Sequence, residues 1–252
     1  MTSPTAVASS FGRAAARYRQ HARVQQAMAD WLAEWLPPVS NRTGSALELG
    51  AGPGVFTEKL LPWSGPLLAT DLSAEMCAEG ARRLPQVAWQ PAFAEAPPAG
   101  PWDWILTSSM LQWVTDPVPA LSAWRRELSP GGRLLGGLFV SPTIPEWLTL
   151  ASAAAPFEWR PAEEWNAALQ SAGLTVSRCE TKTFYFEFSS AVAFLRCLHA
   201  IGAAPARRIP PERLRSHLRE YDARFGSPTG VRSSWTFFRF EATRCLPQRQ
   251  LS

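Results

Sequence analysis

The sequence lacks the cysteine patterns of a disulfide framework and of a zinc site. Its four cysteines form no C-x-x-C pair and have no histidine at metal-ligand spacing: Cys77, Cys179, Cys197 and Cys245. Cysteines separated in this way are typical of small apolar side chains in a reducing compartment. We therefore expect neither a disulfide framework nor a bound metal.

Long apolar runs are missing as well. No stretch reaches the roughly 20 apolar residues that cross a bilayer, and no apolar signal segment accompanies the arginine-rich N-terminus. The sequence therefore predicts a cytoplasmic protein that has no membrane partner. Its apolar content is nevertheless high, with 46% hydrophobic residues, 12 Trp and 13 Phe. Such a composition supports a sizeable core, and the aromatic rings also suggest either a roomy apolar site or a face that binds a partner.

The most informative stretch is an apolar strand that runs into three closely spaced glycines, Gly50, Gly52 and Gly54. Glycines allow a tight turn and a close approach of the backbone to a ligand. A helix predicted directly after the loop, from Val55 to Leu61, makes the arrangement typical of adenosyl and dinucleotide sites. No Gly-Lys-Ser/Thr follows, which excludes a phosphate P-loop, and the G-x-G-x-x-G spacing is absent. Taken alone, the loop could also be an ordinary strand-to-helix turn.

An acidic residue follows at the end of the next predicted strand, Pro66–Leu72. The interval from Glu48 to Asp71 is that of one strand–helix–strand unit, and Ser73 is placed to cap the following helix. An acid at this position can accept hydrogen bonds from both hydroxyls of an adenosine ribose. The simpler alternative is an acid that stabilises a helix N-terminus.

Strands and helices continue to alternate as far as Val140, which predicts a parallel sheet covered on both faces. The predicted elements are strands at 86–90, 102–109 and 133–140 and a helix at 117–128. Beyond them, prolines separate predicted helices at 161–172, 191–200 and 210–224 from strands at 174–180, 182–188 and 235–243.

An apolar stripe before the glycine loop predicts a helix over residues 11–36 that is broken near Tyr18 to His21. We divide the chain into three parts of one structural domain. They are an N-terminal helical arm (1–40), a ligand-binding core (41–140), and the remaining strands with an inserted helical cap (141–252).

Three motifs, in order and spacing, resemble the class I S-adenosylmethionine (SAM)-dependent methyltransferases: Glu48–Gly54, Asp71–Ser73 and the turn Leu128–Gly132. The resemblance implies an α/β fold with a seven-stranded, mostly parallel, Rossmann-like sheet. Here that sheet would carry an N-terminal helical arm and a C-terminal helical cap insertion. It also implies SAM as the cofactor, S-adenosylhomocysteine as its product, and no metal.

A narrower resemblance covers nearly the whole chain. The segments Phe11–Gln25, Ser108–Trp113 and Leu198–Ala203 resemble the malonyl-[acyl-carrier protein] O-methyltransferases of biotin synthesis. That family implies methyl transfer to the free carboxylate of malonyl carried on an acyl carrier protein, which begins pimeloyl synthesis. A carboxylate is ionised at neutral pH, so the reaction needs alignment and exclusion of water and no general base. The lack of an obvious acid–base pair is consistent with this chemistry.

The family pattern also implies which residues contact the cofactor: Glu48, Gly50, Ala51, Gly52, Asp71, Leu72, Met76, Phe93, Ala94, Ser108 and Ser109. Asp71 would bind the ribose, and Leu72 and Met76 would pack against the adenine. Many relatives carry an acid after the third strand that reads the adenine amino group. This chain has Phe93-Ala94-Glu95 there, so Phe93 would pack on the base or the backbone of Ala94 would read it.

For the acceptor carboxylate the candidate catalytic residues are Tyr18, His21 and His199, and Trp113 and the late arginines are further candidates. Tyr18 and His21 belong to an arm that would fold over the site. Alternatively, Tyr18 and His21 are ordinary residues of a helix surface that make an aromatic contact and do not bind substrate. His199 would either contact the substrate or stabilise the C-terminus of its helix.

A positive charge excess distinguishes residues 196–244, which contain ten arginines and four acids, against a net charge of +4 for the whole chain. Acyl carrier proteins are strongly acidic, so a basic face would steer them. We expect that face around Arg207, Arg208, Arg213, Arg215 and Arg219. A solvated helix surface is the alternative. Nucleic acid, the usual competitor for a basic patch, has no recognition motif here.

Two other functions remain open from the sequence. One is a SAM-dependent carboxyl methyltransferase that acts on a free small organic acid, for which the arginine-rich segment would be idle. The other is a non-catalytic SAM-binding protein.

Overall fold

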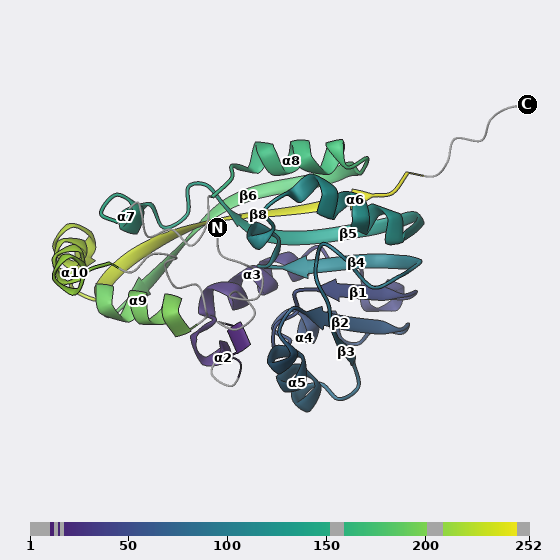
Figure 1. The fold of residues 1–252 in the computed structure, drawn as a ribbon, viewed down its shortest axis with the longest axis horizontal. Coiled ribbons are helices and arrows are strands. Elements are labelled where there is room, and N and C mark those ends of the chain that lie inside the picture. The colour runs from purple at the N-terminus through teal and green to yellow at the C-terminus, as the bar shows by residue number, and fades with distance from the viewer. Residues whose placement is uncertain (1–10, 13–14, 16–17, 152–158, 201–208, 246–252) are drawn as a thin grey trace, which may run out of the picture.

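The architecture is a central sheet with helices on both faces (Figure 1). The computed structural model describes residues 11–12, 15, 18–151, 159–200 and 209–245. The strand order is β3-β2-β1-β4-β5-β8-β6. Neighbours among the first five strands pair in parallel, and β8 lies antiparallel between β5 and β6. The strands are β1 (Ala46–Leu49), β2 (Leu67–Asp71), β3 (Ala88–Pro91), β4 (Trp102–Ser108), β5 (Leu128–Val140), β6 (Thr175–Phe188), the two-residue β7 (Gly226–Ser227) and β8 (Gly230–Thr243). The predicted mostly parallel α/β sheet is confirmed.

Apolar side chains hold helices against both faces of the sheet. On one face, α6 (Pro117–Glu127) and α8 (Ala162–Ser171) bury Trp124 and Trp165. On the other face, α3 (Arg23–Ala33) and α4 (Thr57–Leu60) pack with residues of β1, β4 and β5. Helix α5 (Ala74–Arg83) contacts β2 and β3, and two 3-10 turns are η2 (Val39–Asn41) and η3 (Leu111–Trp113). Continuous burial along β1 is what a strand covered on both sides requires.

The arm and the glycine loop differ from the prediction in their boundaries. The predicted break is confirmed, because α2 (Tyr18–His21) is separated from α3 by Ala22, whose φ and ψ are −82° and 34°. The helix after the glycine loop begins at Thr57 and not at Val55, since residues 52–56 remain in turns. Three glycines with positive φ, at 50, 52 and 54, carry the chain through this loop.

The last two long strands are also longer than predicted. The two strands expected at 174–180 and 182–188 are one 14-residue strand, β6, and β8 begins at Gly230 and not at Trp235. Their pairing runs from Thr175 opposite Thr243 to Phe188 opposite Val231. The pairing has one irregularity, a register shift between Val176 and Arg178. It explains the length, because each strand supplies hydrogen-bond partners for the other beyond the end of the parallel strands. Similarly, β5 begins at Leu128 where the predicted strand began at Arg133.

A helical cap lies at the end of β6 and β8 (Figure 1, left). It consists of α7 (Pro145–Leu148), α9 (Ala191–Ala200) and α10 (Pro211–Phe225). Because α9 and α10 lie between β6 and β8 in the chain, the predicted insertion before the last long strand is confirmed. Phe194 and Tyr221 stack with ring centroids 5.5 Å apart, and Asp222 accepts a hydrogen bond from the Ala191 amide at 2.7 Å. These contacts join the two cap helices.

Two arginines counted toward the predicted positive face are structural, which corrects that count. Arg239 on β8 is buried, with its guanidinium 4.1 and 4.4 Å from the ring centroids of Trp31 and Trp35. It also pairs with Glu34 at 2.9 Å and Glu180 at 2.6 Å. Arg244 donates to the carbonyl oxygens of residues 125, 126 and 128, where β5 begins.

Within the described ranges, no helix combines the length and the apolar character needed to cross a bilayer. The same part of the chain holds no cluster of three or more metal-binding side chains. All four cysteines are free thiols, buried at Cys77 and Cys197 and exposed at Cys179 and Cys245.

Candidate active site

A cavity of about 150 Å³ lies where the carboxyl ends of β1, β2 and β4 meet the arm. Parallel sheets bind ligands at this edge, where neighbouring strand ends diverge. Ten of the eleven predicted cofactor residues line the cavity: Glu48, Gly50, Ala51, Gly52, Asp71, Leu72, Met76, Ala94, Ser108 and Ser109. The eleventh, Phe93, is not in the lining, and 53% of its surface is exposed.

The glycine loop leaves room for a ligand against its backbone. Gly50 has φ +69°, and a Cβ there would come within 2.1 Å of the Met110 side chain. Gly52 has φ +56°, and a Cβ there would meet no atom within 4 Å. The first glycine is therefore required for packing, and the second presents open space to the cavity.

Asp71 is held at the end of β2 by backbone amides. One carboxylate oxygen accepts from the Gly52 N–H and the other from the Ser73 N–H, both at 2.9 Å. Burial raises the pKa of Asp71, and the N–H groups of Ser73, Gly52 and Leu72 oppose that rise. Ser73 accepts from the Met76 amide at 3.2 Å, which confirms the predicted helix cap. The carboxylate is thus fixed between the glycine loop and the start of α5.

Glu48 is a buried carboxyl group that faces the cavity. Burial and then the charge of Asp71 raise its pKa to about 8, although the Thr57 hydroxyl opposes the rise. Its Oε2 atom is buried and has no hydrogen-bond partner among the described residues. Buried polar atoms are seldom left in this state unless a ligand or water completes them. The arrangement therefore fits a polar ligand group beside the glycine loop.

Ser109, the residue after β4, has a strained backbone conformation. Its φ of +59° is uncommon outside glycine. The strain is held by two hydrogen bonds of 2.7 Å, from its N–H to the Gly137 carbonyl and from the Gln112 side chain to its own carbonyl. Its hydroxyl is buried and unpartnered within the described structure. Backbone strain of this kind is most common at functional sites.

Gln25 is a lining residue that the site prediction missed. It is buried on α3, and its Oε1 has no partner in the part of the chain that the structure describes. A signal was present in the sequence, because Gln25 precedes Met28, Ala29 and Leu32 at helical spacing on the buried face. A polar residue on such a face is a candidate for ligand contact.

Aromatic side chains close the cavity on the arm side. Tyr18 is buried and lines the cavity. The ring centroid of Phe11 lies 5.3 Å from that of Trp113, edge to face, and 6.2 Å from that of Tyr18. Burial first, and then the charges of Asp71 and Cys197, raise the pKa of Tyr18. Its phenol therefore stays protonated at neutral pH and can donate a hydrogen bond.

The two candidate histidines are not brought to this cavity. His21 and His199 are both exposed, and neither belongs to the described lining. By contrast, Glu95 does line the cavity, so an acid is available after the third strand, two residues beyond Phe93. The carbonyl of Ala94 accepts from the Trp124 indole at 2.6 Å, so this carbonyl is already bonded within the protein.

Comparisons with known proteins give the family. Residues 18–178 match the family model described as a methyltransferase domain. The malonyl-[acyl-carrier protein] O-methyltransferase of Erwinia billingiae is 31% identical over 79% of each chain. That of Paenibacillus sp. is 27% identical over 90% of this chain and 94% of its own. The biotin biosynthesis bifunctional protein of Bordetella avium is 30% identical over 86% of this chain and 48% of its own.

Solved structures show the same fold. The YcgJ protein of Bacillus subtilis has a TM-score of 0.65 at 16% identity and covers 88% of this chain and 99% of its own. A geranyl diphosphate methyltransferase in complex with SAM has a TM-score of 0.55 at 15% identity, over 87% of this chain and 85% of its own. With the family match over most of the chain, the protein is a SAM-dependent methyltransferase and belongs to the malonyl-[acyl-carrier protein] O-methyltransferase family.

Proposed function

We propose that this enzyme methylates the free carboxylate of malonyl carried on an acyl carrier protein. The product, a malonyl methyl ester, would start pimeloyl and biotin synthesis. The observation that carries the proposal is the shared name of relatives that are about 30% identical over 79% of both chains. The Bordetella avium relative, named for biotin biosynthesis, supports the same pathway.

The cavity fits SAM through the residues that line it. Asp71 would accept hydrogen bonds from the ribose hydroxyls, and the backbone of Gly50, Ala51 and Gly52 would lie against the methionine part, since all four residues line the cavity. Leu72 and Met76 would pack on the adenine, and Glu95 and the Ala94 amide would read its amino group, since these residues also line the cavity. Bound SAM supplies a methyl group on a sulfonium ion, which a carboxylate oxygen can attack directly.

For the acceptor, the chain needs to orient a carboxylate and to keep water away from it. Ser109 offers a hydroxyl and Tyr18 a neutral phenol as donors, whereas the unpartnered atom of Gln25 is Oε1, an acceptor that suits an N–H or hydroxyl group of a ligand. Neutral donors orient a carboxylate without neutralising its charge, so they preserve its reactivity. Phe11 and Trp113 exclude water on the arm side. The exposed histidines are not needed for this arrangement.

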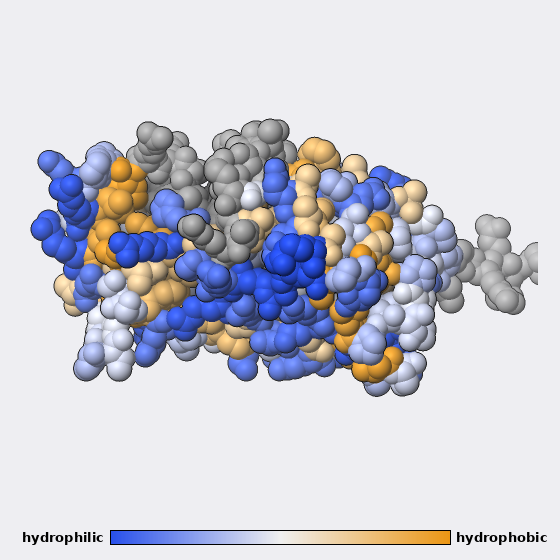
Figure 2. Space-filling view, turned by 90° about the horizontal axis from the view of Figure 1, so that it is seen from below, coloured by the Kyte–Doolittle hydropathy of each residue, from blue (hydrophilic) through white to orange (hydrophobic). Residues whose placement is uncertain are grey.

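The carrier protein is proposed to dock on the cap. Arg213, Arg215 and Arg219 on α10 are exposed, whereas Arg207 and Arg208 lie outside the described residues. Figure 2, seen from below, shows hydrophilic side chains beside a hydrophobic group at the end where α9 and α10 lie. A surface of mixed character with exposed arginines suits an acidic protein partner.

We expect the triple substitution Arg213→Glu, Arg215→Glu and Arg219→Glu to lower kcat/KM for malonyl-carrier protein about tenfold or more at low salt. The reversed charges repel an acidic partner, and added salt screens that repulsion. The rate with malonyl-pantetheine, which lacks the protein, should stay unchanged. Steady-state assays at two ionic strengths measure both effects.

Arg82→Glu is the matched control, because Arg82 is exposed on α5, far from α10 (Figure 1). Its reversal should leave both substrates unaffected. If the wild-type enzyme uses malonyl-pantetheine as well as malonyl-carrier protein, the proposed partner is wrong and a free small acid becomes the better acceptor. Tight SAM binding without methylation of any acyl acceptor would instead indicate a non-catalytic protein.

A further inference from the structure

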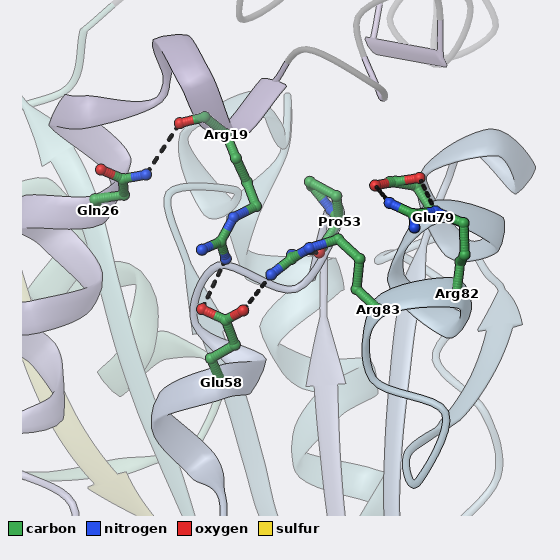
Figure 3. A network of polar contacts seen from close by, with 7 residues as sticks. All are labelled: Arg19, Gln26, Pro53, Glu58, Glu79, Arg82 and Arg83. Carbon is green, nitrogen blue, oxygen red and sulfur yellow. Dashed lines mark hydrogen bonds and ion pairs between the residues drawn. The ribbon is translucent and has the colours of Figure 1, made fainter.

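A network of charged side chains connects the arm to the glycine loop (Figure 3). Arg19 on α2 pairs with Glu58 on α4 at 2.7 Å, and the other oxygen of Glu58 accepts from Arg83 on α5. Arg83 also donates to the carbonyl oxygen of Pro53, in the middle of the glycine loop, at 2.7 Å. Gln26 on α3 donates to the Arg19 carbonyl at 3.0 Å. We call Arg19, Glu58, Arg83 and Pro53 the arm–loop network.

Both ends of the network lie next to cavity residues. Arg19 follows Tyr18, which is buried in the cavity lining. At the other end, Pro53 follows Gly52, whose amide holds Asp71. The Glu58 amide donates to the carbonyl of Gly54 at 3.3 Å, so Glu58 is tied to the loop through its backbone as well. The carboxylate of Glu58 is therefore bound on one side to Arg19 of α2 and on the other side to Arg83, which binds the glycine loop.

The three charges are partly shielded from water. The side chains of Arg19, Glu58 and Arg83 are 36%, 32% and 18% exposed. Partial burial raises the pKa of Glu58, but the two guanidinium groups outweigh it and hold the pKa below its ordinary value. Glu58 is therefore ionised in the folded enzyme at neutral pH. Two arginines that share one partly buried carboxylate stabilise the structure more than a single exposed ion pair does.

We propose that Glu58 is a positioning residue that holds α2 closed over the SAM cavity and couples this closure to the glycine loop. When Arg19 releases Glu58, Tyr18 loses its neighbouring anchor and the arm side of the cavity opens. The network thereby sets how long the cofactor product stays bound. The inference rests on the SAM site and is independent of the acceptor's identity.

The test measures release of S-adenosylhomocysteine from the full chain by stopped-flow displacement. Glu58→Gln and Arg19→Gln should each release it about two- to fivefold faster, the range expected for a partly shielded ion pair. The double variant should be no faster than Glu58→Gln alone, because Glu58→Gln already removes the ion pair that Arg19→Gln removes. Raising the salt concentration should speed release from the wild type toward the rate of the variants.

Asp30→Asn is the matched control. Asp30 pairs with Lys59, the residue after Glu58 on α4, and among the described residues neither of these two side chains forms a hydrogen bond or ion pair with the glycine loop or α2. This variant should keep the wild-type release rate. Hydrogen exchange adds a readout that turnover does not provide: bound S-adenosylhomocysteine should protect the amides of Tyr18–His21 in the wild type and protect them less in Glu58→Gln.

Three outcomes would overturn the proposal: unchanged release in Arg19→Gln, additive effects in the double variant, or equal acceleration in Asp30→Asn. Arg19→Gln keeps the proposal testable even if Glu58→Gln folds poorly, because Arg19 is a partly exposed side chain. A failure of carrier-protein specificity would leave these release rates untouched, so the two proposals fail separately.

Discussion

Asp71→Ala is expected to weaken binding of S-adenosylhomocysteine by about 1.5–3 kcal/mol, the range for losing hydrogen bonds to a charged group. In terms of Kd this is about 10- to 150-fold. The carboxylate ends β2 beside the cavity, and two backbone amides at 2.9 Å fix its orientation. A carboxylate held in this way is preorganised to accept two hydroxyls, which alanine cannot replace.

Calorimetry with two ligands separates the ribose contact from the support that Asp71 gives to the loop. The wild type should bind S-adenosylhomocysteine more tightly than its 2′,3′-dideoxy analogue, and Asp71→Ala should bind the two about equally. Asp103→Ala is the control, because Asp103 is a carboxylate bound to Ser45, outside the cavity lining. If the variant still distinguishes the two ligands as strongly as the wild type, Asp71 does not read the ribose.

Local sequence patterns were sufficient to predict the parallel half of the sheet. The predicted strands are mostly apolar runs bounded by glycine, proline or a helix cap, and one α-helix joins β1 to β2, β2 to β3 and β4 to β5. Residues at the strand ends therefore gather at one edge without further information. That geometry explains why Glu48, Asp71 and Ser108 meet in one cavity although up to 60 positions separate them.

The same local patterns could not predict contacts between residues that are far apart in the sequence. A count of arginines treats Arg239 as a surface charge, yet Glu34, 205 residues away, and two tryptophans of the arm enclose it. The full lengths of β6 and β8 likewise depend on each strand having the other as a partner. The cavity contact of Gln25 was not predicted, because a periodic apolar stripe indicates which residues are buried and not which buried polar atoms lack a partner.

Glu48 gives the largest expected effect, on stability as a function of pH. Its pKa rises from an ordinary value of 4.5 to about 8 because the group is buried and lies near the Asp71 charge. Between these values the folded protein binds more protons than the unfolded chain, so stability falls as pH rises from about 4.5 to about 8. The full shift corresponds to about 5 kcal/mol, and water entering the ionised site should reduce the loss to about 2–4 kcal/mol.

Urea unfolding of the ligand-free protein between pH 5 and pH 8.5 measures this loss, and Glu48→Gln should remove most of it. Glutamine has nearly the same shape and no proton to lose, so the variant should match the wild type near pH 5 and exceed it by about 2–4 kcal/mol near pH 8. Asp71, whose pKa burial also raises, remains in both proteins, so its own burial contributes to both curves. Glu164→Gln, at an exposed position on α8, should run parallel to the wild type. Parallel curves for Glu48→Gln and the wild type would instead mean that Glu48 ionises freely, and that the cavity admits enough water to solvate it.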